Sequence, residues 1–182
     1  MKIIDSIKTS IALLLVVMST AHADTGQPLL RGATWTLTSS CEAKYKCSTI
    51  KADGSTELAR VEFPYEPVSA KENNGTIEIL YSCGTECSAT YFILPDNSTS
   101  GPYSLVTSID YEKGTLLSLS KNEIRLFRFA PAEKSAIKSI HVKIPENSTL
   151  PSRLVDSQLS NHTYSITYKD ASNRKTSITI EQ

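Results

Sequence analysis

The sequence predicts an all-β protein, a single-domain antiparallel meander of about 10 to 12 short strands. Segments in which apolar and polar residues alternate recur along the chain, and they are rich in Val, Ile, Thr and Tyr. Clusters of Gly, Pro, Asn and Asp separate these segments and indicate tight turns. Only residues 130–136 have a helix-forming pattern, which suffices for a single turn. We expect a sandwich or a barrel-like closure, with a small propeller-like arrangement as the alternative.

The first 23 residues have the three-part layout of a secretory signal peptide. Lys2 and Lys8 lie ahead of the apolar run 11–18. Ala21-His22-Ala23 then places small residues before a cleavage site at Asp24. The apolar run is shorter than the roughly 20 residues that a membrane span requires. We therefore expect a protein that is exported to the periplasm or the medium, with no membrane span in the mature chain.

The remainder of the chain has the size and composition of one globular domain. The 182 residues include 19 basic and 19 acidic side chains, and 40% are hydrophobic, which is outside the range of disordered chains. A neutral chain lacks the basic surface that nucleic acid requires. We divide the sequence into a signal peptide, residues 1–23, an N-terminal extension, residues 24–33, and a single all-β domain, residues 34–182.

The four cysteines indicate two disulfides, because an even number of cysteines in an exported chain is typical of a disulfide framework. Cys41 and Cys47 flank a reversal between two predicted strands, and Cys83 and Cys87 flank another. Facing positions at the mouth of a hairpin come within disulfide reach, so we predict these two pairs; a pairing between the hairpins is the alternative. The spacings match neither zinc sites nor redox motifs, so we expect no metal and no cofactor.

The first half of the domain contains five predicted strands, each ended by turn residues. Pro64 and Pro67 end the third strand, and Asn73-Asn74-Gly75 forms the turn into the fourth. The loop 95–102 has the highest density of turn formers and follows the fifth strand. The strands are expected at residues 34–39, 46–51, 57–63, 76–81 and 89–94.

The second half repeats this pattern. The turns Glu112-Lys113-Gly114 and Lys121-Asn122 separate three strands, and Pro145 ends a fourth. Each half alone is small for an independent core, so one continuous domain is favoured. The strands are expected at residues 103–109, 115–120, 123–129, 140–144, 153–159, 164–168 and 176–180.

Residues that could carry catalysis are few and scattered. His141 alternates with apolar residues in a predicted strand, and His162 lies in a predicted turn, so both are expected to be structural polar residues. The sequence has no nucleophile elbow, zinc-protease motif or phosphate-binding loop. We therefore expect a protein that is not an enzyme.

Two pairs of carboxylates are candidate hydrolytic acids, because two acids suffice for glycoside hydrolysis. Glu57 and Glu62 have an odd separation and point to opposite faces of a regular strand, and Glu78 with Glu86 has no distinctive spacing. An enzyme with an unrecognised carboxylate site is therefore the third-ranked hypothesis. Four Asn-x-Ser/Thr sites are expected to be ordinary turn residues, with glycan acceptors of a eukaryotic secretory chain as the alternative: Asn74, Asn97, Asn147 and Asn161.

Binding to another macromolecule is the function that the composition favours. Tyr45 lies in the first cysteine loop, Tyr65 lies between two prolines and Tyr103 follows Gly101-Pro102, so all three are candidate partner contacts. The first hypothesis is a protein-binding inhibitor or immunity-type protein whose partner is an exported hydrolase or toxin. The alternative is an envelope module that binds cell-wall carbohydrate or assists surface assembly.

Overall fold

The computed structural model describes residues 28–85, 87–131 and 135–182. The predicted signal peptide therefore lies outside the described residues, as do residues 132–134 of the helical turn predicted at 130–136. Within them, 65% of the chain is strand and 3% is helix, and the all-β meander that the sequence predicts is confirmed.

The described strands form four antiparallel sheets, each built from strands that are consecutive in the chain. Sheet A contains β1 (Pro28–Arg31), β2 (Thr36–Ala43), β3 (Lys46–Asp53) and β4 (Thr56–Phe63). Sheet B contains β5 (Pro67–Asn73), β6 (Thr76–Gly84), β7 (Cys87–Ile93) and β8 (Thr99–Ser104). Sheet C contains β9 (Val106–Asp110), β10 (Thr115–Leu119), β11 (Glu123–Arg128) and β12 (Lys138–His141). Sheet D contains β13 (Leu154–Ser160), β14 (Thr163–Lys169) and β15 (Lys175–Glu181), preceded by the single helical turn α1 (Leu150–Arg153).

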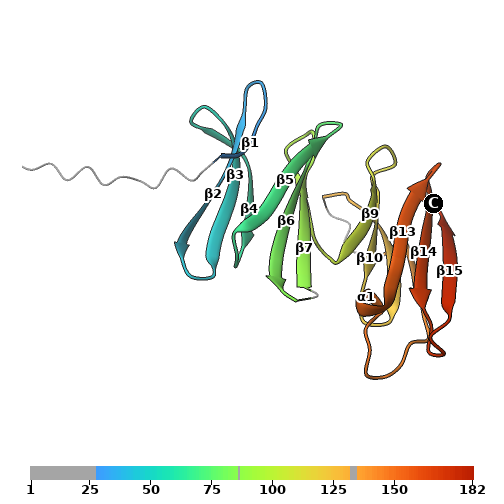
Figure 1. The fold of residues 1–182 in the computed structure, drawn as a ribbon. Helices are drawn as coiled ribbons and strands as arrows, with labels where there is room; N and C mark the ends of the chain where they lie inside the picture. The colour runs from blue at the N-terminus through green and yellow to red at the C-terminus, as the bar shows by residue number, and fades with distance from the viewer. Residues whose placement is uncertain (1–27, 86, 132–134) are drawn as a thin grey trace, which may run out of the picture.

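The sheets stack in chain order, as Figure 1 shows, with a hydrophobic cluster between each sheet and the next. Leu37 and Val61 of sheet A pack with Ile77, Ile79 and Tyr81 of sheet B. The clusters that join the other sheets are Phe92, Tyr103, Leu116 and Phe129 between sheets B and C, and a larger set that includes Leu117, Ile124, Tyr164 and Ile166 between sheets C and D. The described strands thus form an open stack of layers and do not close into a barrel.

Neighbouring sheets are not all aligned strand over strand. Sheets A and B face each other from β1 over β5 to β4 over β8, so their edges coincide. Between sheets B and C, β9 faces β7 and β10 faces β8. Sheet C is therefore displaced sideways relative to sheet B, and its edge strand β9 lies over the middle of sheet B.

Several elements differ from the sequence-based prediction. Residues 28–31, assigned to an extension, form β1, because they pair with β2 and place Leu29 and Leu30 against the core between sheets A and B. The predicted loop 95–102 overlaps β8, whose pairing with β7 outweighs the turn preference of Gly101 and Pro102. The strand expected at 140–144 is confined to 138–141.

Candidate functional site

Two disulfides close the hairpins β2–β3 and β6–β7. Cys41 lies directly opposite Cys47 in the register of β2 and β3, and the Cα atoms of Cys83 and Cys87 lie 5.1 Å apart across the β6–β7 turn. These are the two pairs that the sequence predicts, and the alternative pairing between hairpins is not formed. Both hairpin turns lie at the same edge of the stack, the lower edge in Figure 1.

Two of the three candidate tyrosines meet beside the first disulfide. Tyr45 lies in the β2–β3 turn with a φ of 69°, and its side chain is 56% exposed. Tyr65 follows β4 and is 37% exposed, and the two ring centroids lie 5.6 Å apart in an edge-to-face arrangement. Lys44 Nζ lies 4.9 Å from the centroid of the Tyr45 ring. We call Tyr45 and Tyr65 together the tyrosine surface.

A chain of aromatic contacts anchors the tyrosine surface to the core. The Phe63 ring lies 6.0 Å from the Tyr65 ring and 4.5 Å from the Tyr81 ring, centroid to centroid. Tyr81 is buried, and its hydroxyl shares a 2.8 Å hydrogen bond with the Thr49 hydroxyl. Burial raises the pKa of Tyr81 to about 12, so the group stays neutral. The exposed tyrosine rings are thus connected through Phe63 to the buried residue Tyr81.

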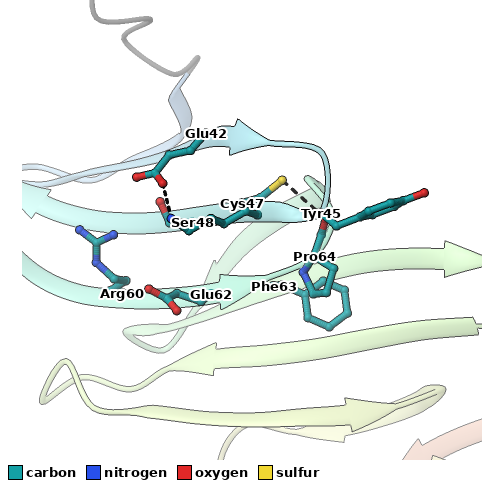
Figure 2. A pocket seen from close by; sticks show the side chains of 9 residues that line it. Glu42, Tyr45, Cys47, Ser48, Arg60, Glu62, Phe63 and Pro64 are labelled. Carbon is teal, nitrogen blue, oxygen red and sulfur yellow. Dashed lines mark hydrogen bonds and ion pairs between the residues drawn. The ribbon is translucent and has the colours of Figure 1, made fainter.

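A hollow of about 280 Å³ opens beside the tyrosine surface on the solvent side of β3 and β4. Figure 2 shows the Tyr45 side chain pointing away from the end of the hollow where Glu42, Arg60 and Glu62 lie. Lys46 forms a 2.5 Å ion pair with Glu42, and this hydrogen-bonded contact lowers the pKa of the Glu42 carboxyl. The lining residues are Glu42, Tyr45, Lys46, Cys47, Ser48, Arg60, Glu62, Phe63 and Pro64.

Tyr103 does not belong to this surface, and its prediction as a partner contact is corrected here. The side chain is 4% exposed and lies in the core between sheets B and C. Its hydroxyl shares a 2.7 Å hydrogen bond with the Ser100 hydroxyl and donates a 3.3 Å bond to the Arg128 carbonyl. Because β8 pairs with β7, the residue after Gly101-Pro102 points inward.

An aspartate–histidine pair, which sequence reasoning missed, joins sheets C and D. His162 Nδ1 lies 2.6 Å from Asp110 Oδ2, and Gln182 Nε2 donates a 2.9 Å bond to the same oxygen. Burial raises the pKa of Asp110, but the hydrogen bonds from His162, Lys113 and Gln182 outweigh burial and lower it overall. The two partners are 52 residues apart in sequence, so no local pattern could indicate their contact.

This pair has one feature of a hydrolase site, a buried carboxylate that orients an imidazole. In a hydrolase the second ring nitrogen faces a nucleophile. Here His162 Nε2 faces the carboxylate of Glu112 at 3.6 Å. The arrangement therefore ties the β9–β10 turn to the β13–β14 turn.

The other candidate acids and histidines are engaged in local contacts. Glu57 forms a 2.6 Å ion pair with Arg60, and His141 Nε2 lies 3.7 Å from a Glu123 carboxylate oxygen. Glu78 contacts Lys71 and Tyr111, whereas Glu86 lies outside the described residues. In the part of the chain that the structure describes, no group of three or more His, Cys, Asp or Glu side chains is arranged to hold a metal ion.

The Asn-x-Ser/Thr sites lie where the sequence places them, in turns. Asn74, Asn97 and Asn161 each adopt a positive φ, a conformation that asparagine tolerates better than most residues. Asn97 also accepts a 2.8 Å hydrogen bond from the buried Lys51 ammonium. Turn formation thus accounts for these three asparagines.

Within residues 28–182, apart from the gaps at 86 and 132–134, no helix has the length and apolar character of a membrane span. The chain matches no family model and no curated protein.

Proposed function

We propose that this chain is an exported, non-catalytic binding protein whose tyrosine surface holds another exported protein. Within that class we favour an inhibitor of a cell-wall hydrolase or an immunity-type protein against a secreted toxin. The observation that carries the proposal is the exposed pair Tyr45 and Tyr65 on a hairpin closed by a disulfide.

The chemistry of the tyrosine surface supports a protein partner. Tyrosine is enriched among the residues that contribute most to protein–protein binding, because its large ring buries apolar area and its hydroxyl still forms hydrogen bonds. The Cys41–Cys47 bridge and the Phe63 contact fix the hairpin before binding. Such preorganisation lowers the entropy lost on association.

Export is supported by the disulfides and by the signal-peptide pattern. Disulfides persist in oxidising compartments and are rare in the cytosol. Removal of residues 1–23 takes two basic and one acidic residue from the 19 of each, so 17 basic and 18 acidic residues remain. A nearly neutral mature protein favours a partner that is recognised through shape and aromatic contacts.

A carbohydrate ligand is the second candidate, because the hollow beside Tyr45 presents polar groups next to an aromatic ring. Ser48, Arg60 and Glu62 line it and offer donors and acceptors for sugar hydroxyls. A sugar needs no protein partner, so the two candidates separate in a binding experiment.

The test is affinity capture with the mature chain, residues 24–182 with both disulfides intact, from envelope and secreted fractions, with quantification by mass spectrometry. We expect one hydrolase or toxin at a near one-to-one ratio, reduced by about tenfold or more with the double variant Tyr45→Ala/Tyr65→Ala. The matched control is Ile137→Ala, which removes an equally exposed apolar side chain from the distant sheet C region.

Three outcomes would contradict the inhibitor proposal. A partner captured equally well by the double variant would assign binding to another surface. Direct binding of the protein to purified cell-wall polysaccharide, lost in the double variant, would favour the carbohydrate candidate. Capture of no protein and no polysaccharide would reject both.

A further inference from the structure

We propose that the cleft between sheets B and C is a second binding site, which takes an extended polypeptide segment with a basic side chain. The segment adds a strand to the open edge of β9. This site is separate from the tyrosine surface and does not depend on the function proposed for it.

The displacement of sheet C creates the cleft. Because β9 faces β7 and β10 faces β8, the main contacts between sheets B and C among the described strands do not involve β5 or β6. Within the described residues β9 is the outermost strand of sheet C, with β10 as its only paired neighbour. Figure 1 shows β9 between the β5–β7 strands and β13. Two hollows show that the position next to β9 and above β6 is vacant.

Two hollows occupy this vacant position. The first, about 270 Å³, is lined by Lys71, Glu78, Leu80 and Thr90 of sheet B on one side and by residues 106–109 of β9 on the other. The second, about 440 Å³, shares Ile109 and Tyr111 with the first and continues to the β13–β14 turn. Together they follow the whole edge of β9, which at about 3.3 Å per residue is long enough to pair with a short strand.

The backbone of β9 selects a polypeptide as the ligand. An edge strand presents a row of unpaired N–H and C=O groups. An added strand forms hydrogen bonds with this row, whereas the polar groups of a sugar or a small anion do not have the same spacing. Ser157 holds β9 in place from sheet D, since its hydroxyl lies 2.7 Å from the Ser108 hydroxyl and donates a 3.1 Å bond to Thr107 Oγ1. The edge is thus fixed before a ligand arrives.

The floor of the cleft is also preformed. The Tyr111 hydroxyl donates a hydrogen bond to Glu78, whose carboxylate forms a 3.1 Å ion pair with Lys71. Burial and the neighbouring Glu78 carboxylate raise the pKa of Tyr111, so it remains a donor. Half-buried Leu80 lies beside this network and offers an apolar contact to an inward side chain of the added strand.

Charge complementarity indicates the basic residue. The charged lining of the two hollows includes Lys71 against Glu78, Asp110 and Glu112, and these four residues give a net charge of −2. Glu78 is paired with Lys71, and Asp110 is held by His162. The Glu112 carboxylate lies 3.6 Å from His162 Nε2, but its side chain is 73% exposed. A lysine or arginine at the Glu112 end of the bound strand would neutralise this carboxylate.

The test uses the full mature chain, labelled with ¹⁵N, and a synthetic seven-residue probe peptide of alternating Thr and Val with Lys at both ends. We expect amide shifts concentrated at residues 106–112 and 71–80. The same peptide with Glu at both ends should bind about tenfold more weakly, as should the Lys peptide to the variant Glu112→Lys. Glu146→Lys makes the same charge change at an exposed residue of the loop after β12, at the opposite edge of sheet C from β9, and should leave affinity unchanged.

Backbone methylation of the probe distinguishes strand addition from side-chain contact. Two isomers, N-methylated at the odd or at the even residues, block opposite edges of an extended strand, so only one should lose binding. Loss with both or with neither isomer would overturn the proposal, as would shifts centred on Tyr45 and Tyr65 or no shifts at millimolar peptide. A retained spectrum of each free variant shows that it is folded.

Discussion

Asp110 is a buried carboxylate that is held by residues far from it in the sequence. Besides His162 and Gln182, the backbone N–H groups of Glu112 and Lys113 donate to its carboxylate, at 3.1 and 3.0 Å. A buried carboxylate that accepts this many bonds is stabilised as the anion. The residue therefore links the β9–β10 turn, sheet D and the end of β15 through one charge.

Acid should unfold the protein partly through Asp110. Its pKa is lowered in the folded state, so the stabilisation is complete above the unfolded pKa of about 3.9 and is lost as pH falls through the folded value. Asp110→Asn should cost about 3 kcal/mol at pH 7 and flatten the decline of stability below pH 4. Urea unfolding between pH 7 and pH 2.5 measures both effects. The exposed Asp156→Asn is the control, and an equal acid dependence in Asp110→Asn would contradict the assignment.

Tyr103 and Tyr45 should respond oppositely to substitution. Tyr103→Phe removes a hydroxyl that bonds Ser100 and Arg128, so we expect a loss of about 1 kcal/mol of unfolding free energy and unchanged partner capture. Tyr45→Ala alters an exposed ring, so it should change stability by less than about 0.5 kcal/mol and weaken capture. Denaturant unfolding and capture yields, measured on both variants, check the contrast. Weakened capture by folded Tyr103→Phe would contradict it.

At the scale of elements, the two disulfide-closed hairpins differ because only the β2–β3 hairpin carries a residue of the tyrosine surface. Both disulfides close short loops, with sequence separations of 6 and 4 residues. Short loops remove little entropy from the unfolded chain, so each bridge should contribute about 2 to 3 kcal/mol. Only the first bridge lies under Tyr45.

Removing each bridge separately should separate stability from binding. Cys41→Ser/Cys47→Ser and Cys83→Ser/Cys87→Ser should destabilise the protein by similar amounts, but only the first pair should weaken partner capture. Thermal unfolding and capture yield are the measurements, and non-reducing peptide mapping of the parent protein checks the two pairings. Equal weakening of capture by both double variants would show that binding does not depend on the β2–β3 hairpin.

At the scale of the whole molecule, the stack is joined by three cores of unequal size. Among the described residues, the cluster between sheets B and C has four buried members, against eight between sheets A and B and ten between sheets C and D. Hydrophobic stabilisation follows the apolar area that is buried. The B–C junction is therefore the weakest link of the stack, and the displacement that opens the cleft beside β9 is the physical reason.

Weakening this junction should divide unfolding into two steps. Phe92 and Phe129 stack there with ring centroids 4.6 Å apart, so Phe129→Ala should cost about 3 to 4 kcal/mol. Hydrogen exchange should then show sheets A and B opening independently of sheets C and D. The matched control Phe63→Ala lies between sheets A and B and should leave the C–D half protected. A single cooperative transition in Phe129→Ala would show that the junction between sheets B and C is more stable than its buried apolar area predicts.

The sequence by itself determined the fold class, most strand positions and both disulfide pairs, because these depend on side-chain alternation and on contacts a few residues apart. Thr76–Gly84 and Cys87–Ile93 illustrate this, since their alternation and the cysteines at their turn are local. The exposed positions of Tyr45 and Tyr65 follow from loop chemistry in the same way.

Only the tertiary structure decided the stacking order of the sheets, the burial of Tyr103, the pairing of Asp110 with His162 and the cleft beside β9. Each of these depends on which faces of distant strands meet. Sequence alternation shows that a strand has an apolar face, but it does not specify the sheet that covers it. The inward side of β8 was therefore set by its pairing with β7, and the vacant place above β6 by the sideways displacement of sheet C over sheet B.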